Sequence, residues 1–243
     1  MQYRCVLPAL LAAVLTPQPT LAAKVEKTQV FLSNGELNYV GELSIEANAK
    51  VFALYKKLKE KPTTLSINSP GGNTDVGMAL GKWVYQNKLD VKVLEGCYSS
   101  CANYVFPAAR HKTVSNFAVI GYHGGLSSMS FNIDDASIAH LGAAQKDGQK
   151  VTRESVMEII RKAIAPQLER EAKYFEAIGV QQRITTLGQD EKYKKAAPEG
   201  VVGWYYDIED FAKLGVSNIT VINPPWQPKM LGTEKTVYKL TLE

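Results

Sequence analysis

The segment TLSINSPGGNTDVGMALGKWVYQ, residues 64–86, joins a strand pattern to a helix pattern through a sharp loop. Thr64–Ile67 is short, and its β-branched and apolar residues are typical of a strand. Ser69–Gly72 contains a proline and two glycines, which favour a tight turn. A helix pattern then runs from about Thr74 to Gln86, and another strand pattern follows at Val91–Leu94. A strand, a crossover helix and a second strand predict a parallel sheet covered by helices.

The same alternation extends to both sides of this segment. The other expected strands are Thr28–Leu32, Asn38–Leu43, Lys112–Val114 and Ala118–Tyr122, and the other expected helices are Ala47–Leu58 and a stretch in which Gly96–Ser100 turns into a helix through Ala109. The predicted fold class is therefore α/β with a mostly parallel sheet.

The pattern changes after His123. Residues 132–187 are mostly helical in spacing, with an apolar stripe that Pro166 is expected to kink, and they form a helical insertion that caps the sheet or mediates assembly. The segments Trp204–Tyr206 and Ser217–Ile222 and a helix at Ile208–Leu214 close an α/β domain of residues 24–223. Three prolines then mark residues 224–243 as an irregular tail.

The first 23 residues have the features of a signal peptide. Arg4 gives a positive start, Val6–Leu15 is apolar, and Thr20–Ala23 offers small residues for cleavage. This predicts an exported protein, in a bacterial periplasm or secreted; the alternative is an uncleaved membrane anchor. No later stretch reaches the length of about 18 apolar residues that a membrane helix requires, so we expect no stable membrane span after cleavage of the leader.

Composition excludes several classes of protein. Apolar residues make up 45% of the chain and charged residues 21%, as in ordinary globular proteins. The net charge of +4 is too small to argue for a nucleic-acid partner. Three histidines and one close cysteine pair give no zinc pattern, and no phosphate-binding glycine motif is present, so we expect no metal and no cofactor.

Export changes how the cysteines are interpreted. Removing the leader leaves Cys97 and Cys101 in an oxidising compartment, where disulfides persist. Across one helical turn their Cα atoms would lie about 6 Å apart, within the range that a disulfide tolerates. A disulfide would stiffen the serine pair between them; the alternative is two buried free thiols.

Several residues could carry out acyl transfer. Gly71 and Gly72 can present bare amide groups beside a helix N-terminus, Ser99 or Ser100 can present a hydroxyl, and His123 ends the following strand. A hydroxyl, a base and fixed amide donors are the parts that acyl transfer needs. The alternative is that these residues only form turns and helix caps.

The order of these motifs resembles one known family. Asn68–Gly72 followed by Gly77–Ala79, then Gly96–Ala102, then Val119–His123, is similar to the Clp-type serine peptidases and their ClpP-like, crotonase-fold relatives. The resemblance covers roughly residues 30–123. It implies a spiral of β-β-α units, peptide hydrolysis by serine and histidine, and a homo-oligomer that is often ring-shaped.

Carried over to this chain, the resemblance gives each candidate a role. Gly72 and the Ser100 amide match the oxyanion donors, and His123 matches the base. Small residues at the second and third positions after the serine favour Ser99 as the nucleophile, whereas counting forward from Gly96 favours Ser100. The third acid has no clear counterpart; Glu199 is the tentative choice, and Asp190 is the other option. The cysteines that flank the serines resemble exported relatives.

These features lead to one hypothesis and one alternative. The hypothesis is an exported serine hydrolase that acts on a peptide or protein substrate. The alternative is a catalytically inactive ClpP-like module for binding or assembly. Thioester chemistry of the crotonase kind would need an adenine-nucleotide pocket that the sequence does not indicate.

Overall fold

The computed structural model describes residues 27–128, 138, 151–233 and 235–243. The predicted leader at residues 1–23 lies outside this part of the chain. Residues 132–137 and 139–150 of the predicted helical insertion also lie outside it.

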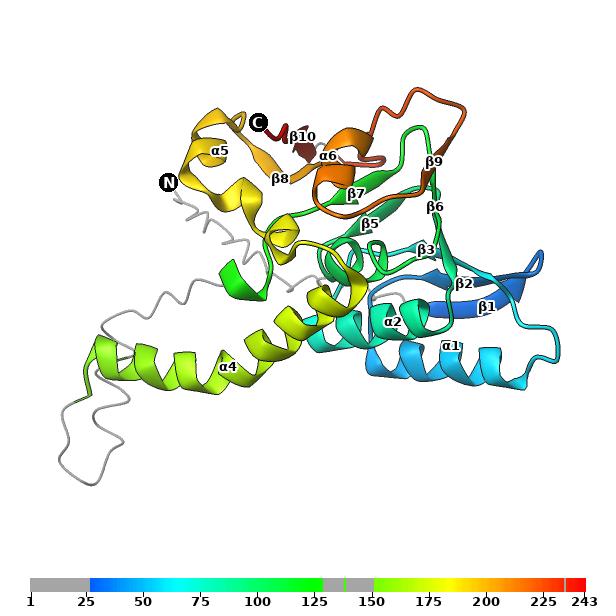
Figure 1. Ribbon diagram of the computed structural model, residues 1–243, viewed down its shortest axis with the longest axis horizontal. Coiled ribbons are helices and arrows are strands. Elements are labelled where there is room, and N and C mark those ends of the chain that lie inside the picture. The colour runs from blue at the N-terminus through cyan, green and yellow to red at the C-terminus, as the bar shows by residue number, and fades with distance from the viewer. Residues whose placement is uncertain (1–26, 129–137, 139–150, 234) are drawn as a thin grey trace, which may run out of the picture.

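A six-stranded sheet forms the first layer, in the order β1-β2-β3-β4-β6-β9 (Figure 1). Its strands are β1 (Gln29–Ser33), β2 (Glu36–Val40), β3 (Thr64–Asn68), β4 (Asp90–Val93), β6 (Lys112–Ser115) and β9 (Ile219–Ile222). All neighbours pair in parallel except β1, which pairs antiparallel with β2 at the edge. The predicted α/β class with a mostly parallel sheet is confirmed.

A second, smaller layer continues from the ends of the first. Its strands β5 (Gly96–Tyr98) and β7 (Val119–Gly121) pair in parallel. Ser69 bridges to Cys97 on one side of this pair, and Trp204 bridges to Tyr122 on the other. Thus β4 is followed directly by β5, and β6 by β7, so that consecutive units of the chain pass from one layer into the other.

The predicted irregular tail contributes a strand. β10 (Thr236–Lys239) pairs in parallel with β8 (Val201–Tyr205), and Leu240 and Leu242, which follow β10, are buried. The three prolines of residues 224–228 indicated an irregular connection, but β8 offers an edge for pairing and the two leucines anchor the end of the chain to the core. Neither effect is visible in the local pattern.

The two helices predicted before the serine pair are present. α1 (Ile45–Lys57) is capped by Ser44, whose side chain accepts from the Ala47 amide. α2 (Thr74–Gln86) is capped by Asn73, whose side chain accepts from the Asp75 and Val76 amides. α1 and α2 lie side by side, and α4 passes on the other side of α2 (Figure 1).

The helix expected to grow out of Gly96–Ser100 is different in the structure. Residues 96–98 form β5 instead, because they pair with β7 in the second layer. A short π-helix, η1 (Cys101–Val105), follows, and the Phe106 amide donates to the Cys101 carbonyl over five residues. The helix therefore begins later in the chain and is shorter than its apolar pattern predicts.

α4 (Arg153–Ile178) contains Pro166 in its interior, and Figure 1 shows that the helix bends along its length. Only Glu171, Tyr174 and Phe175 are buried, whereas Ile159 is 64% exposed. The C-terminal part of α4 packs against the domain, and the other part extends away from it (Figure 1).

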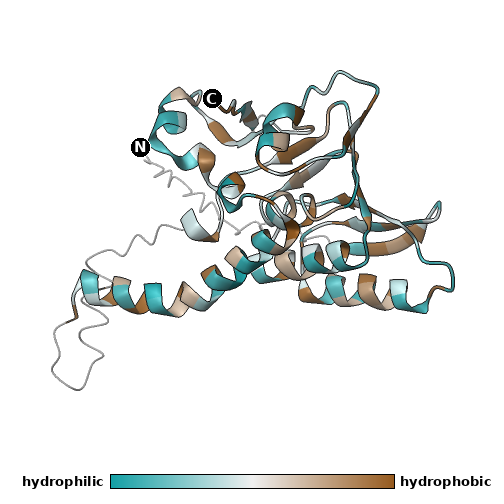
Figure 2. Ribbon diagram, in the orientation of Figure 1, coloured by the Kyte–Doolittle hydropathy of each residue, from teal (hydrophilic) through white to brown (hydrophobic). Residues whose placement is uncertain are grey.

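The remaining elements surround the second layer. They are η2 (Leu126–Ser128), η3 (Gln182–Thr185), η4 (Leu187–Gln189), α5 (Glu191–Ala196) and α6 (Ile208–Lys213). Apolar residues concentrate on the strands, and polar residues cover the outer faces of the helices (Figure 2). A cluster of buried aromatic rings, Tyr122, Tyr206 and Phe211, joins β7 to the C-terminal elements.

Lys112 at the start of β6 makes folding depend on pH. Its side chain is buried, its Nζ donates to the carbonyls of Ala109 and Ser217, and burial lowers its pKa from the usual 10.5 to about 8. The unfolded chain therefore holds more protons between about pH 8 and pH 10.5, so stability attributable to Lys112 rises with pH across this window. Below about pH 8 both states are charged, and this dependence disappears.

We expect the free energy of unfolding of the wild type to gain at most about 3 kcal/mol relative to Lys112→Met between these two pH values. Urea unfolding at a series of pH values measures the difference. Lys56→Met, an exposed substitution on α1, is the control and should parallel the wild type. Parallel pH curves for wild type and Lys112→Met would contradict the assignment.

Candidate functional site

Residues from four separate segments of the chain line one cavity of about 250 Å³. They come from the loop before α2 and the start of that helix, from the turn after β5 and from η1, from the segment after β7, and from the end of η4. The lining residues are Gly72, Thr74, Ser99, Ser100, Asn103, His123, Gly124, Gly125, Leu126, Ser128 and Gln189. The structure thus brings together the predicted candidates Gly72, Ser99, Ser100 and His123.

The loop before α2 lies directly against the serine turn. Gly71 has a φ angle of +97°, and a Cβ placed on it would lie 2.6 Å from the Tyr98 carbonyl oxygen and 2.7 Å from Ser99 Cβ. No side chain fits in so little space. The glycine is therefore needed both for its backbone angle and for the contact.

Ser99 occupies a strained turn between β5 and η1. Its φ angle of +53° lies in the left-handed region, which is uncommon for a serine. Its amide donates to the Gly121 carbonyl at 2.9 Å, which ties the turn to the end of β7. The residue is partly exposed, and its hydroxyl makes no hydrogen bond within the part of the chain that the structure describes. The turn therefore presents a free hydroxyl to the cavity.

Ser100 has a different environment. It is only 2% exposed, and its hydroxyl donates to the Gly72 carbonyl at 2.7 Å. Gly77 of α2 lies against it, because a Cβ on that glycine would come within 2.9 Å of Ser100 Cβ. Ser100 thus joins the turn to α2.

His123 lies two residues after the end of β7 and is exposed. Its carbonyl accepts from Gln189 Nε2 at 2.9 Å, which fixes its backbone to η4. Within the described ranges, neither ring nitrogen has a hydrogen-bond partner, and no bond links the imidazole to Ser99 or Ser100.

Asn103 connects the two halves of the site. Its amide donates to the Ser99 carbonyl at 2.7 Å, and its side-chain Nδ2 donates to the Gly124 carbonyl at 2.9 Å. Its Oδ1 is buried and has no partner among the described residues. Neither Asn103 nor Gln189 was predicted from the sequence. A polar residue four positions after Ser99 in an otherwise apolar stretch was the only local signal for Asn103.

Two backbone amides beside the cavity are candidates for binding an anion. Those of Gly72 and Ser100 have no acceptor in the portion of the chain described. By contrast, Asn73 Oδ1 already accepts from the Asp75 and Val76 amides at the start of α2. The Gly72 and Ser100 amides, rather than the N-terminal amides of α2, are therefore available to stabilise an oxyanion.

Cys97 and Cys101 form a disulfide, as the sequence allowed, with their Cα atoms 5.2 Å apart. The expected geometry of one helical turn is wrong, because Cys97 lies in β5 and Cys101 begins η1. The bond closes the turn that holds Ser99 and Ser100. Both cysteines are fully buried.

The acidic candidates do not line the cavity. Glu199 is exposed in the turn before β8, and Asp190 is exposed at the start of α5. Neither side chain has a hydrogen bond or ion pair within the described residues, and neither lines the cavity. The role of Glu199 as third acid stays a prediction.

The described residues contain no cluster of three or more histidine, cysteine, aspartate or glutamate side chains suited to a metal ion. In the same residues, no helix combines the length and apolar character needed to cross a membrane. Comparison with protein-family models and with curated proteins found no match for this chain.

The contact between Gly71 and the serine turn can be tested by substitution. Gly71→Ala adds a clash to an unfavourable backbone angle, whereas Gly179→Ala, at a φ angle of +70° with open space around it, adds only the angle. We expect Gly71→Ala to destabilise the protein by about 1–3 kcal/mol more than Gly179→Ala. Chemical unfolding measures both values. Equal losses would show that the loop does not need the close approach.

Proposed function

We propose that this chain is an exported serine hydrolase with a ClpP-like fold that cleaves peptide bonds. The observation that carries the proposal is the Ser99 hydroxyl, which has no hydrogen bond within the described residues and shares one cavity with His123 and the free Gly72 amide. The backbone of Ser99 is strained at the same time. A nucleophile on a sharp turn between a strand and a helix, next to a base and amide donors, has the parts that acyl transfer requires.

The reaction would run in two stages. Ser99 Oγ attacks the substrate carbonyl while His123 accepts the serine proton, and the Gly72 and Ser100 amides hold the negative oxygen. His123 then donates that proton to the leaving amine, and an acyl-enzyme remains. Water, deprotonated by His123, hydrolyses the ester, and the proton returns to Ser99. Asn103 would position the nucleophile and the base relative to each other through its bonds to Ser99 and Gly124.

Ser100 is the other candidate nucleophile. Its hydroxyl would have to leave the Gly72 carbonyl before it could attack, and its 2% exposure limits access. The free hydroxyl and greater exposure of Ser99 favour Ser99.

One observation favours the second candidate function, an inactive module for binding or assembly. The His123 ring has no hydrogen bond to either serine within the described residues. Catalytic hydrogen bonds are often loose before substrate binds, so a chemical test must separate the two functions.

Two features support the fold and location within this proposal. Successive strands pass from the large sheet into the small one before the chain turns away, which is the arrangement expected of repeated β-β-α units. The disulfide beside Ser99 suits an oxidising compartment such as the periplasm.

Labelling with a fluorophosphonate tests the proposal directly. The mature protein should be labelled at one serine, because only an activated hydroxyl reacts at a useful rate. Ser99→Ala should abolish the label, His123→Ala should slow it by at least about a hundredfold, and Ser100→Ala should retain it. Mass spectrometry of intact protein and peptides measures the extent and the position.

Ser127→Ala provides a control, since this exposed serine does not line the cavity. Loss of the label only in Ser100→Ala would identify Ser100 as the nucleophile. A folded wild-type protein that takes no label would support the inactive module instead.

A further inference from the structure

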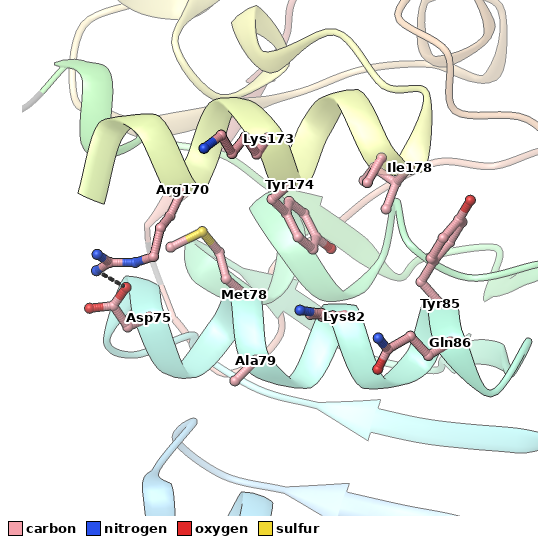
Figure 3. A pocket seen from close by; sticks show the side chains of 11 residues that line it. Asp75, Met78, Ala79, Lys82, Tyr85, Gln86, Arg170, Lys173, Tyr174 and Ile178 are labelled. Atoms are coloured by element: carbon pink, nitrogen blue, oxygen red, sulfur yellow. Dashed lines mark hydrogen bonds and ion pairs between the residues drawn. The ribbon is translucent and has the colours of Figure 1, made fainter. Parts of the chain in front are cut away.

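A second, larger cavity lies outside the candidate site. It has a volume of about 500 Å³ and lies between α2 and α4 (Figure 3). Its volume is within the range typical of ligand sites in proteins. None of its lining residues lines the cavity of Ser99 and His123. We call it the α2–α4 groove.

The floor of the groove is apolar. Met78 extends from α2 and Tyr174 from α4 into the space between the two helices (Figure 3), and both are at least nine-tenths buried. Ala79, Ala177 and Ile178 add further apolar surface. Met78 and Tyr174 are already shielded from water, so the apolar surface that a partner would bury is that of the exposed Ala79 and Ala177 and the half-buried Ile178.

The groove is formed by the faces of two helices. α2 contributes Asp75, Met78, Ala79, Lys82, Tyr85 and Gln86, and α4 contributes Arg170, Lys173, Tyr174, Ala177 and Ile178. On each helix these positions are separated by three or four residues, so they form a continuous stripe. Two parallel stripes with an apolar floor suit a third helix that lies between them.

The rim of the groove is mainly cationic. Lys82, Arg170 and Lys173 line it, and Asp75 is the single carboxylate. Asp75 pairs with Arg170 at 3.0 Å, and Lys173 pairs with Glu169 on its own helix at 2.7 Å. Lys82 is exposed and has no ion pair within the described residues. A partner with carboxylates beside its apolar stripe would match this rim.

We propose that the α2–α4 groove binds an amphipathic, acidic helix of a partner protein. The apolar stripe of that helix would cover Ala79, Ala177 and Ile178. Its carboxylates would pair with Lys82 and would share Lys173 with Glu169. A second copy of this chain is a poorer match, since its net charge of +4 has the same sign as the rim. This docking site is independent of the proposed serine chemistry.

Fluorescence anisotropy with a designed peptide tests the proposal. The probe is a labelled helix of about 18 residues with leucines at i, i+3, i+4 and i+7 and glutamates beside them. The second peptide has lysines in place of the glutamates. We expect the wild type to bind the glutamate peptide at least about tenfold more tightly than the lysine peptide.

Charge reversal locates the site. Lys82→Glu/Lys173→Glu should weaken binding of the glutamate peptide at least about tenfold and should strengthen binding of the lysine peptide. Lys56→Glu/Lys57→Glu on α1 makes a matched change of two charges outside the groove and should leave both affinities unchanged. Circular dichroism and thermal unfolding confirm that each variant is folded. Ser99→Ala should bind like the wild type, which separates this test from the one for the hydrolase.

Three results would overturn the proposal. The first is equal affinity of the wild type for the two peptides, and the second is a charge-reversal variant that binds as the wild type does. The third is a dimer in light scattering that Lys82→Glu/Lys173→Glu abolishes, which would make a second copy the occupant.

Discussion

The contact between the Gly71–Gly72 loop and the serine turn is the constraint on which the rest of the site depends. Ser69 and Cys97 bring the two segments together through a bridge in which the Ser69 amide donates to the Gly96 carbonyl and the Tyr98 amide donates to Ser69, both at 3.0 Å. At Gly71 this spacing leaves no space for a Cβ. The segments that follow β3 and β4 are thereby joined in the second layer, at the place where the amides of Gly72 and Ser100 meet the serine hydroxyls.

The serine turn is held from three directions. The disulfide closes it from Cys97 to Cys101, the Ser99 amide reaches back to Gly121, and Asn103 binds both the Ser99 carbonyl and Gly124. A left-handed serine costs conformational energy, and such a residue persists only where its surroundings determine its conformation. The stored strain and the fixed partners are consistent with a preorganised site, in which few groups must move during reaction.

α2 connects the candidate site to the α2–α4 groove. Its first residues follow Gly72, one of its faces packs against Ser100 and Tyr104 through Gly77 and Gly81, and another face forms the α2–α4 groove. Tyr174 on the floor of that groove donates its hydroxyl to the Tyr104 carbonyl, and Glu171 accepts from the Tyr104 hydroxyl at 2.6 Å. A partner that bound in the groove would therefore touch a residue in direct contact with η1, the helix that follows Ser99.

Local residue patterns were enough to identify most of the parallel sheet and its helices. The alternation of short apolar runs with helical spacing predicted β3, α2, β4, β6 and β7 closely, because each is bounded by a proline, a glycine or a change of period. The cysteine spacing made a disulfide feasible before its geometry was known. The convergence of Gly72, the serine pair and His123 also followed from the sequence, since loops at the same end of parallel strands meet at one edge of a sheet.

Only the tertiary structure decided what depends on contacts between distant segments. Residues 96–98 became a strand because β7 was available to pair with them, and residues 236–239 became a strand because β8 had an open edge. The roles of Asn103 and Gln189 arise from single hydrogen bonds to residues 21 and 66 positions away in the chain. A local pattern reports burial and backbone preference over a few residues, whereas a hydrogen bond between remote segments exists only once the whole fold has brought them within about 3 Å.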